Sequence, residues 1–355
     1  SFRPLFPVPR WVPLVGTAGC AFAMFIINPV FGLVAVGVVL VVYIYLIKRH
    51  LQAPFGDVRS GLFVALAEWA ATKVATLPEN QERSWKPNML VPVENPPVLR
   101  GAFDLLRALA APRGTVRILG LDTPGPDPWE LEKRLERLGR AFREEGTFAS
   151  WTRMETEDFS DGVVAGVEAL NGSFFQPNII FLSLPKQSEP GKIEGIQRIS
   201  ACAKENNFGL VIYAEHPDAQ LGRRHNVNVW LPDAGPDWEL TTKPGKSDLE
   251  LLLAYKMRRN WDADLRVIAR VDNDQQRPEA KAYVDGLLDL ARLPHARGMV
   301  TKLEPPIRHG AAPEADLHLL WLGEEPDYGR MITIRENLAG SCLFIRGSGR
   351  ESALA

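Results

Sequence analysis

Two long apolar runs near the start of the chain restrict its fold more strongly than any other feature. Residues 11–27 and 30–47 contain no Asp, Glu, Lys or Arg, and Asn28-Pro29 separates them. A helix rises about 1.5 Å per residue, so each run comes close to spanning the ~30 Å hydrocarbon core of a bilayer. Because Asn-Pro favours a turn and breaks a helix, the sequence predicts a transmembrane helical hairpin within residues 1–50.

The charges around this hairpin indicate which side of the membrane its ends occupy. The first acidic residue is Asp57, and the basic residues before it are Arg3, Arg10, Lys48 and Arg49. Both open ends of the hairpin are therefore basic and its turn is uncharged, so the positive-inside rule places both ends in the cytoplasm. We expect a multi-pass protein of the cell inner membrane with residues 51–355 in the cytoplasm.

Two other interpretations of the apolar runs fit less well. A cleaved signal peptide has one apolar segment, whereas here a second run follows at once. A buried hairpin of a soluble protein normally keeps a polar stripe, which neither run has. The chain begins at Ser1 without an initiator Met and leads directly into a membrane helix. We therefore expect it to be the C-terminal part of a longer membrane protein, although removal of a tag would also explain the missing Met.

The rest of the chain has a different composition. The whole chain has a net charge of −2, and since residues 1–56 carry +4, residues 57–355 carry −6. This sign argues against a nucleic-acid-binding protein. Residues 51–84 are expected to form a linker, in which a helix over residues 58–77 would place Leu62, Leu66 and Trp69 on one face. That helix could lie under the membrane or pack on its own domain.

Beyond the linker, short apolar runs alternate with longer amphipathic segments. The predicted strands are 89–93, 116–121, 150–154, 179–184, 210–214, 227–231, 265–271, 299–303, 317–322 and 343–346. The predicted helices are 98–110, 129–145, 162–171, 193–206, 247–260 and 279–292. This alternation predicts βαβ units and an α/β fold with a parallel sheet covered on both faces.

The two halves of this region look alike. Trp85 and Trp261 each precede a strand, and in each half an amphipathic helix containing Leu-Leu follows. We therefore predict two similar α/β subdomains, over residues 85–235 and 236–355, with an internal duplication as their origin.

The motifs that could bind a cofactor or a metal are incomplete. Gly245-Lys246-Ser247 resembles a phosphate-binding loop, but Leu240 stands where that motif needs a Gly, so we expect Ser247 to cap a helix instead. His216 and His225 lack zinc-ligand spacing, and we predict no metal site. Asp272-Asn273-Asp274 is expected to form a turn at the end of a strand rather than a calcium loop.

One glycine-rich segment stays as a weak candidate for a binding site. Gly347, Ser348 and Gly349 directly follow the last predicted strand, where their backbone amides could bind an anion. A flexible C-terminal tail is the alternative explanation. No set of side chains with catalytic spacing is present, so we expect neither an enzyme nor a resident cofactor.

Several segments, in order, resemble cation–chloride cotransporters. Residues 2–4 and the hairpin that ends at residues 43–45 are similar to the last two membrane helices of that family, and residues 55–77 are similar to its linker. The segment 84–91, Ser-Trp-Lys-Pro-Asn-Met-Leu-Val, resembles the entry into its cytoplasmic domain. Residues 248–253 and 258–261 are similar to the helix that opens the second half in prokaryotic members.

This resemblance implies the tail of a secondary transporter of the amino acid–polyamine–cation superfamily that couples chloride to sodium and/or potassium. The ion-binding helices would lie in a part of the transporter that this chain does not contain. The resemblance also implies two subdomains related to universal stress proteins, and a homodimer formed through the cytoplasmic domain, with the hairpin as a second candidate contact. A membrane-tethered nucleotide sensor and the tail of an amino-acid permease relative are the alternatives.

Overall fold

The computed structural model describes residues 85–124, 128–171, 173, 176–185, 190–232, 238, 240, 245–293, 295–302 and 312–353, and scattered residues between 15 and 73. The chain separates into two compact units, Ser1–Arg83 and Ser84–Ala355.

The first unit contains the predicted hairpin and linker, which lie largely outside the described residues. The described positions within the two apolar runs are helical, among them Val15, Phe22, Val34 and Val41. In the part of the chain that the structure describes, no helix has the length and apolarity needed to cross a bilayer. The membrane hairpin therefore stays a prediction.

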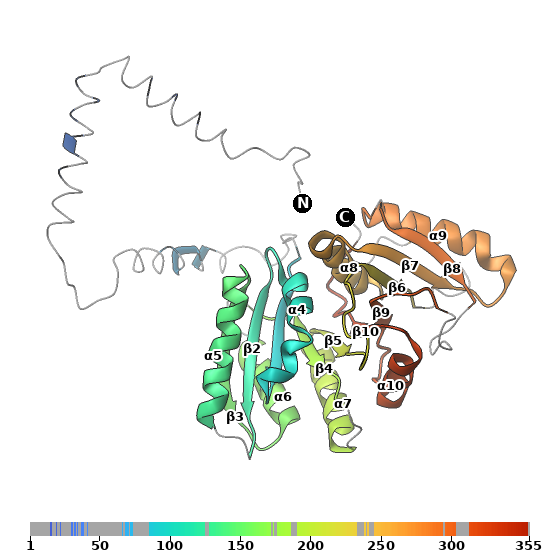
Figure 1. Ribbon diagram of the computed structural model, residues 1–355, viewed down its shortest axis with the longest axis horizontal. Helices are drawn as coiled ribbons and strands as arrows, with labels where there is room; N and C mark the ends of the chain where they lie inside the picture. Colours follow the sequence, from blue (N-terminus) through green and yellow to red (C-terminus); the bar gives the residue numbers. More distant parts are fainter. Residues whose placement is uncertain are drawn as a thin grey trace. The chain divides into compact units, whose positions relative to one another are not determined.

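The second unit is built on a single sheet of ten strands, in the order β3-β2-β1-β4-β5-β10-β9-β6-β7-β8 (Figure 1). The strands are β1 Asn88–Val93, β2 Thr115–Asp122, β3 Phe148–Glu155, β4 Ile179–Ser183, β5 Gly209–Ala214, β6 Asn226–Trp230, β7 Asp264–Arg270, β8 Arg297–Thr301, β9 Leu317–Trp321 and β10 Ser341–Arg346. The predicted α/β class is confirmed, and each predicted strand overlaps one of these ten.

Two layers of helices cover the sheet. The helices are η1 Pro96–Arg100, α4 Phe103–Ala110, α5 Pro128–Glu144, α6 Phe159–Asn171, α7 Pro190–Glu205, α8 Asp248–Trp261, η2 Asp274–Gln276, α9 Arg277–Leu290 and α10 Tyr328–Asn337. Apolar side chains of α4, α5, α8 and α9 fill the core on one face of the sheet. Those of α6, α7 and α10 fill the core on the other face.

The sheet consists of two arms with the same topology. The first arm runs β3-β2-β1-β4-β5, and the second runs β8-β7-β6-β9-β10. β1 therefore corresponds to β6, and β4 corresponds to β9. β6 falls inside the range 85–235 that we predicted for the first subdomain, but it pairs with β7 and β9 of the second arm. The structure therefore divides the halves before β6, earlier than position 235.

Backbone hydrogen bonds repeat between the two arms and fix the correspondence of residues. The Asn88 amide N–H donates to Asn178 Oδ1 at 2.8 Å, and the Asn226 N–H donates to Asp316 Oδ2 at 3.0 Å. In return, the Asn178 N–H donates to the Asn88 carbonyl and the Asp316 N–H to the Asn226 carbonyl, both at 2.9 Å. The internal repeat is therefore present, but our predicted register, which matched the strand after Trp85 with the strand after Trp261, is wrong by one strand.

The two arms meet at one antiparallel pair of strands, which we call the seam. β5 and β10 run in opposite directions, with Ile212 opposite Phe344, while every other pair of neighbouring strands is parallel. The sheet therefore contains one antiparallel pair, whereas the sequence predicted a parallel sheet. The seam follows from the symmetry of the fold, because joining two equivalent arms through their last strands requires those strands to run antiparallel.

Candidate functional site

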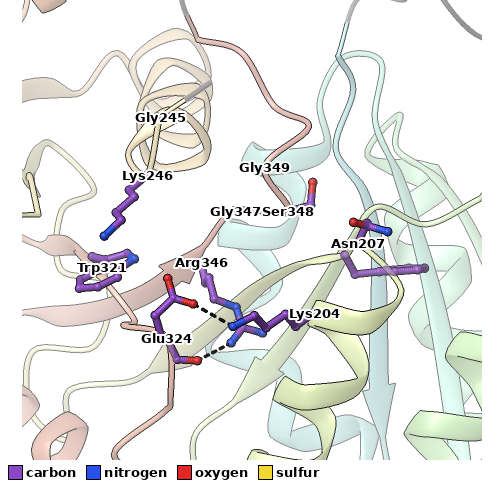
Figure 2. A pocket seen from close by; sticks show the side chains of 11 residues that line it. Lys204, Asn207, Gly245, Lys246, Trp321, Glu324, Arg346, Gly347, Ser348 and Gly349 are labelled. Carbon is purple, nitrogen blue, oxygen red and sulfur yellow. Dashed lines mark hydrogen bonds and ion pairs between the residues drawn. The ribbon is translucent and has the colours of Figure 1, made fainter. Parts of the chain in front are cut away.

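A pocket of about 270 Å³ lies at the seam (Figure 2). It forms where β9 and β10 end and where α7 leads into β5. Its lining residues are Lys204, Asn207, Phe208, Gly245, Lys246, Trp321, Glu324, Arg346, Gly347, Ser348 and Gly349. The weak candidate from the sequence, residues 347–349, is therefore brought together with three basic side chains that the sequence alone did not associate with it.

The amide of Ser348 already binds a carboxylate of the same chain. The Ser348 N–H donates to both oxygens of Glu351, at 2.9 and 3.1 Å, and the Ser348 hydroxyl donates to Glu351 Oε1 at 2.9 Å. Glu351 is buried. An incoming anion would have to displace this carboxylate, so anion binding by residues 347–349 stays a prediction, and the segment is held in a turn rather than forming a loose tail.

Lys204, Glu324 and Arg346 converge at the base of the pocket (Figure 2). Lys204 Nζ pairs with Glu324 Oε2 at 3.0 Å. The Lys204 ammonium, and beyond it the charges of Lys246 and Arg346, lower the pKa of Glu324. Glu324 therefore serves as the counter-ion of a local group of three cations.

Arg346 is a buried tie between the two arms. Its guanidinium donates to the Ser200 hydroxyl and carbonyl, both at 2.7 Å, and to the Glu324 carbonyl at 3.0 Å. Ser200 lies on α7 of the first arm, while Arg346 ends β10 of the second. Hydrogen bonds from a charged donor are stronger than neutral ones, so this contact stabilises the seam beyond the backbone pairing of β5 with β10.

The segment before α8 forms the opposite wall of the pocket. Lys246 Nζ lies 5.0 Å from the centroid of the Trp321 ring, within the range of a cation–π contact. Ser247 occupies the N-cap position of α8, but its side chain caps no amide. Asp248 instead accepts a hydrogen bond from the Gly245 N–H at 2.8 Å. The prediction that Ser247 stands at the N-cap of this helix is therefore confirmed, although its side chain makes no capping hydrogen bond.

A buried carboxyl group lies in the first turn of α8. Glu250 is 1% exposed, and neither of its carboxylate oxygens has a hydrogen-bond partner in another described residue. Burial, together with the nearby charges of Asp248 and Glu351, raises the pKa of Glu250 well above its ordinary value, against the opposing effect of its own amide. Burial therefore favours the protonated, neutral form of this carboxyl group, and the sequence pattern offered no sign of it.

The other sequence candidates have structural roles. His216 Nδ1 accepts hydrogen bonds from the amides of Asp218 and Ala219, which closes the turn after β5. Asn273 caps η2 by accepting from the amides of Gln275 and Gln276, so the predicted strand-end turn is confirmed. Within the described residues, no three His, Cys, Asp or Glu side chains are grouped so as to hold a metal ion.

The polar groups of the pocket therefore largely form hydrogen bonds and ion pairs with one another, and their clearest role is to hold the two arms together.

Comparison with known proteins identifies the domain that the two arms form. The family model for the prokaryotic cation-chloride cotransporter C-terminal domain, first part, matches residues 91–221, and the model for its second part matches residues 222–354. The chain belongs to the prokaryotic cation-chloride cotransporters.

A solved structure supports this identification. The crystal structure of the cytoplasmic domain of a prokaryotic cation chloride cotransporter is 37% identical, with a TM-score of 0.68, and the match covers 76% of this chain and 98% of that one. The boundary between the two family models, at residues 221 and 222, falls just before β6. The second unit is thus a cytoplasmic C-terminal domain of such a cotransporter, and the family is a transporter family rather than an enzyme family.

Other solved structures are more distant. A universal stress protein from Archaeoglobus fulgidus DSM 4304 is 13% identical with a TM-score of 0.45, and the match covers 74% of this chain and 97% of that one. A putative universal stress protein from Pseudomonas aeruginosa UCBPP-PA14 is 11% identical with a TM-score of 0.44, and the match covers 74% of this chain and 94% of that one. No curated protein matches the chain.

Proposed function

We propose that this chain is the membrane-anchored regulatory and dimerising part of a secondary transporter that couples chloride to sodium and/or potassium. Residues 1–50 would form the last membrane hairpin, and residues 51–84 would connect it to the cytoplasmic domain. Membership in the cotransporter family supports a role in transport. The ions themselves would bind in helices outside this chain. Two copies would associate through their cytoplasmic domains.

The seam is the observation that best supports a regulatory role. One continuous sheet passes through both arms, and Arg346 ties β10 to α7 across their junction. A body built in this way can change orientation as a unit, because its two arms share a core on each face of the sheet. Regulation of transport would then act through the orientation of the whole domain rather than through movement of one arm against the other.

Ion uptake into proteoliposomes tests regulation. We expect Arg346→Met, placed in the transporter that carries this chain, to change chloride-dependent cation uptake about fivefold or more per folded transporter, within the usual range of allosteric coupling. Arg140→Met on α5 is the matched control, since Arg140 is exposed and pairs only with Glu136 among the described residues. Equal uptake by both variants, at equal amounts of folded protein, would argue against a regulatory role.

A further inference from the structure

A second set of contacts joins the two arms on the face that α4 and α8 cover. These helices lie side by side at the centre of the sheet (Figure 1). Lys256 Nζ on α8 donates to the Ala111 carbonyl, just past the end of α4, at 2.9 Å. Asn260 Nδ2, one turn later, donates to the carbonyls of Ala108 and Ala111 at 2.5 and 3.1 Å. The end of α8 therefore caps the end of α4.

Two arginines stand beside this cap. Arg259 lies one turn after Lys256 on α8, and Arg113 lies two residues after Ala111. Both are exposed, and within the described part of the chain neither has a hydrogen bond or an ion pair. Burial, together with the charges of Arg259 and Arg113, lowers the pKa of Lys256 to about 8. Arg113 and Arg259 thus lie close enough to Lys256 for their charges to act on it, and we call the three side chains the basic cluster.

Two carboxylates at neighbouring helix ends are already paired with other arginines. Glu145, at the end of α5, pairs with Arg107 at 2.8 Å. Asp262, directly after α8, pairs with Arg258 at 3.1 Å. The basic cluster therefore has no carboxylate of its own among the described residues.

The negative end of the α4 dipole compensates for only part of this charge. The carbonyl end of a helix acts as about half a negative elementary charge. The hydrogen bond from Lys256 to the Ala111 carbonyl satisfies part of the Lys256 ammonium. Arg113 and Arg259 make no such hydrogen bond to a described residue. With Lys256 charged, an excess of roughly two positive charges stays beside the joint, which favours the binding of an anion there.

The position of the basic cluster indicates where such an anion could come from. Arg113 lies two residues before β2, and the Thr115 N–H, at the start of that strand, donates to the Pro87 carbonyl at 3.0 Å. The basic cluster thus lies near the start of β2, beside the segment that leads into β1, and Lys86 in that segment is exposed. In the proposed function, the linker over residues 51–84 leads into this segment.

We propose that Arg113, Lys256 and Arg259 form a binding site for a phosphate-class anion. The headgroup of an anionic phospholipid and free phosphate offer the same chemistry. A phospholipid headgroup as the bound anion rests on the proposed membrane anchoring, whereas the anion site itself does not. Binding at this joint neutralises the repulsion between the two arms and stabilises α8 against α4.

Binding to vesicles and to phosphate tests the site. The relative with 37% identity was crystallised as a cytoplasmic domain alone, so residues 84–355 are expected to fold without the hairpin. This fragment is incubated with vesicles of phosphatidylcholine, with or without one third phosphatidylglycerol, and separately titrated with inorganic phosphate by calorimetry. Arg113→Gln/Arg259→Gln is compared with Arg137→Gln/Arg140→Gln, which removes two positive charges from exposed sites on α5.

We expect the cluster variant to bind roughly thirtyfold more weakly than the α5 variant. Loss of binding to anionic vesicles assigns a lipid headgroup, and loss of phosphate binding alone assigns a soluble anion. Equal binding by the two variants, to vesicles and to phosphate alike, overturns the proposal. Light scattering on the same samples separates this result from the proposed function, since a monomeric fragment that still binds through the basic cluster contradicts dimerisation only.

Discussion

Replacing Arg346 with Met is expected to lower the free energy of unfolding of the cytoplasmic domain by about 3 kcal/mol. The substitution removes the charged donor from the buried Ser200 carbonyl and from the part-buried Glu324 carbonyl. Met occupies much of the vacated space but donates no hydrogen bond. Urea unfolding, followed by circular dichroism, measures the change.

The form of the unfolding transition matters as much as its midpoint. Because both arms share one sheet and two common cores, we expect the variant and the wild type to unfold in a single transition. Arg346→Lys should recover part of the loss, since an ammonium can reach one of the acceptors but not all of them. A change below about 0.5 kcal/mol, the usual range for surface substitutions, would show that Arg346 does not tie the arms together.

Replacing Glu250 with Gln is expected to change how stability depends on pH. The raised pKa of Glu250 means that the folded state holds a proton which the unfolded state releases near the ordinary value of 4.5. The wild type therefore loses stability as pH rises above 4.5, until the folded carboxyl itself ionises, at a rate of up to about 1.4 kcal/mol per pH unit. Gln cannot ionise, so the variant should lose this dependence and be the more stable protein at neutral pH.

Unfolding curves measured at several pH values between 5 and 8 test this prediction. Part of the slope should persist in the variant, because burial also raises the pKa of Asp248. Glu144→Gln, at an exposed position near the end of α5, is the matched control and should follow the wild type at every pH. If Glu250→Gln shows the wild-type slope, the Glu250 carboxyl is ionised in the folded protein.

The class of the fold could be predicted because it depends on local patterns. The buried strands read as short apolar runs, and the longer helices show amphipathic spacing, so each predicted strand overlaps an observed one. α10 was missed, because Ile332-Thr333-Ile334 places β-branched residues in a short segment and weakens the helical pattern. The direction of β10 against β5 could not be predicted, since their partners are more than 120 residues apart in the chain.

The repeat was found in the wrong register for a related reason. Trp85 and Trp261 are conspicuous in the sequence, but Trp261 ends α8 and precedes the second strand of its arm. Asn88 and Asn226 occupy equivalent positions, and only their hydrogen bonds to Asn178 and Asp316 reveal it. A single sequence shows no pattern for residues that are far apart in the chain and correspond only through their hydrogen-bond partners.

The same limit applies to the candidate site. Residues 347–349 could be singled out from their composition. That Glu351 accepts the hydrogen bonds of the Ser348 amide could not be predicted. Lys204 and Arg346 meet at Glu324 because the seam brings α7 beside β10. Likewise, Arg113 and Arg259 belong to different arms and become neighbours of Lys256 only through the packing of α4 on α8.

Dimerisation is the property whose measurement tests the proposed function most directly. Light scattering of the purified chain in detergent, at micromolar concentration and with the detergent contribution subtracted, gives the protein mass of the particle. A regulatory domain that works in pairs predicts twice the 39.5 kDa mass of one chain. A particle with the mass of a single chain would contradict it.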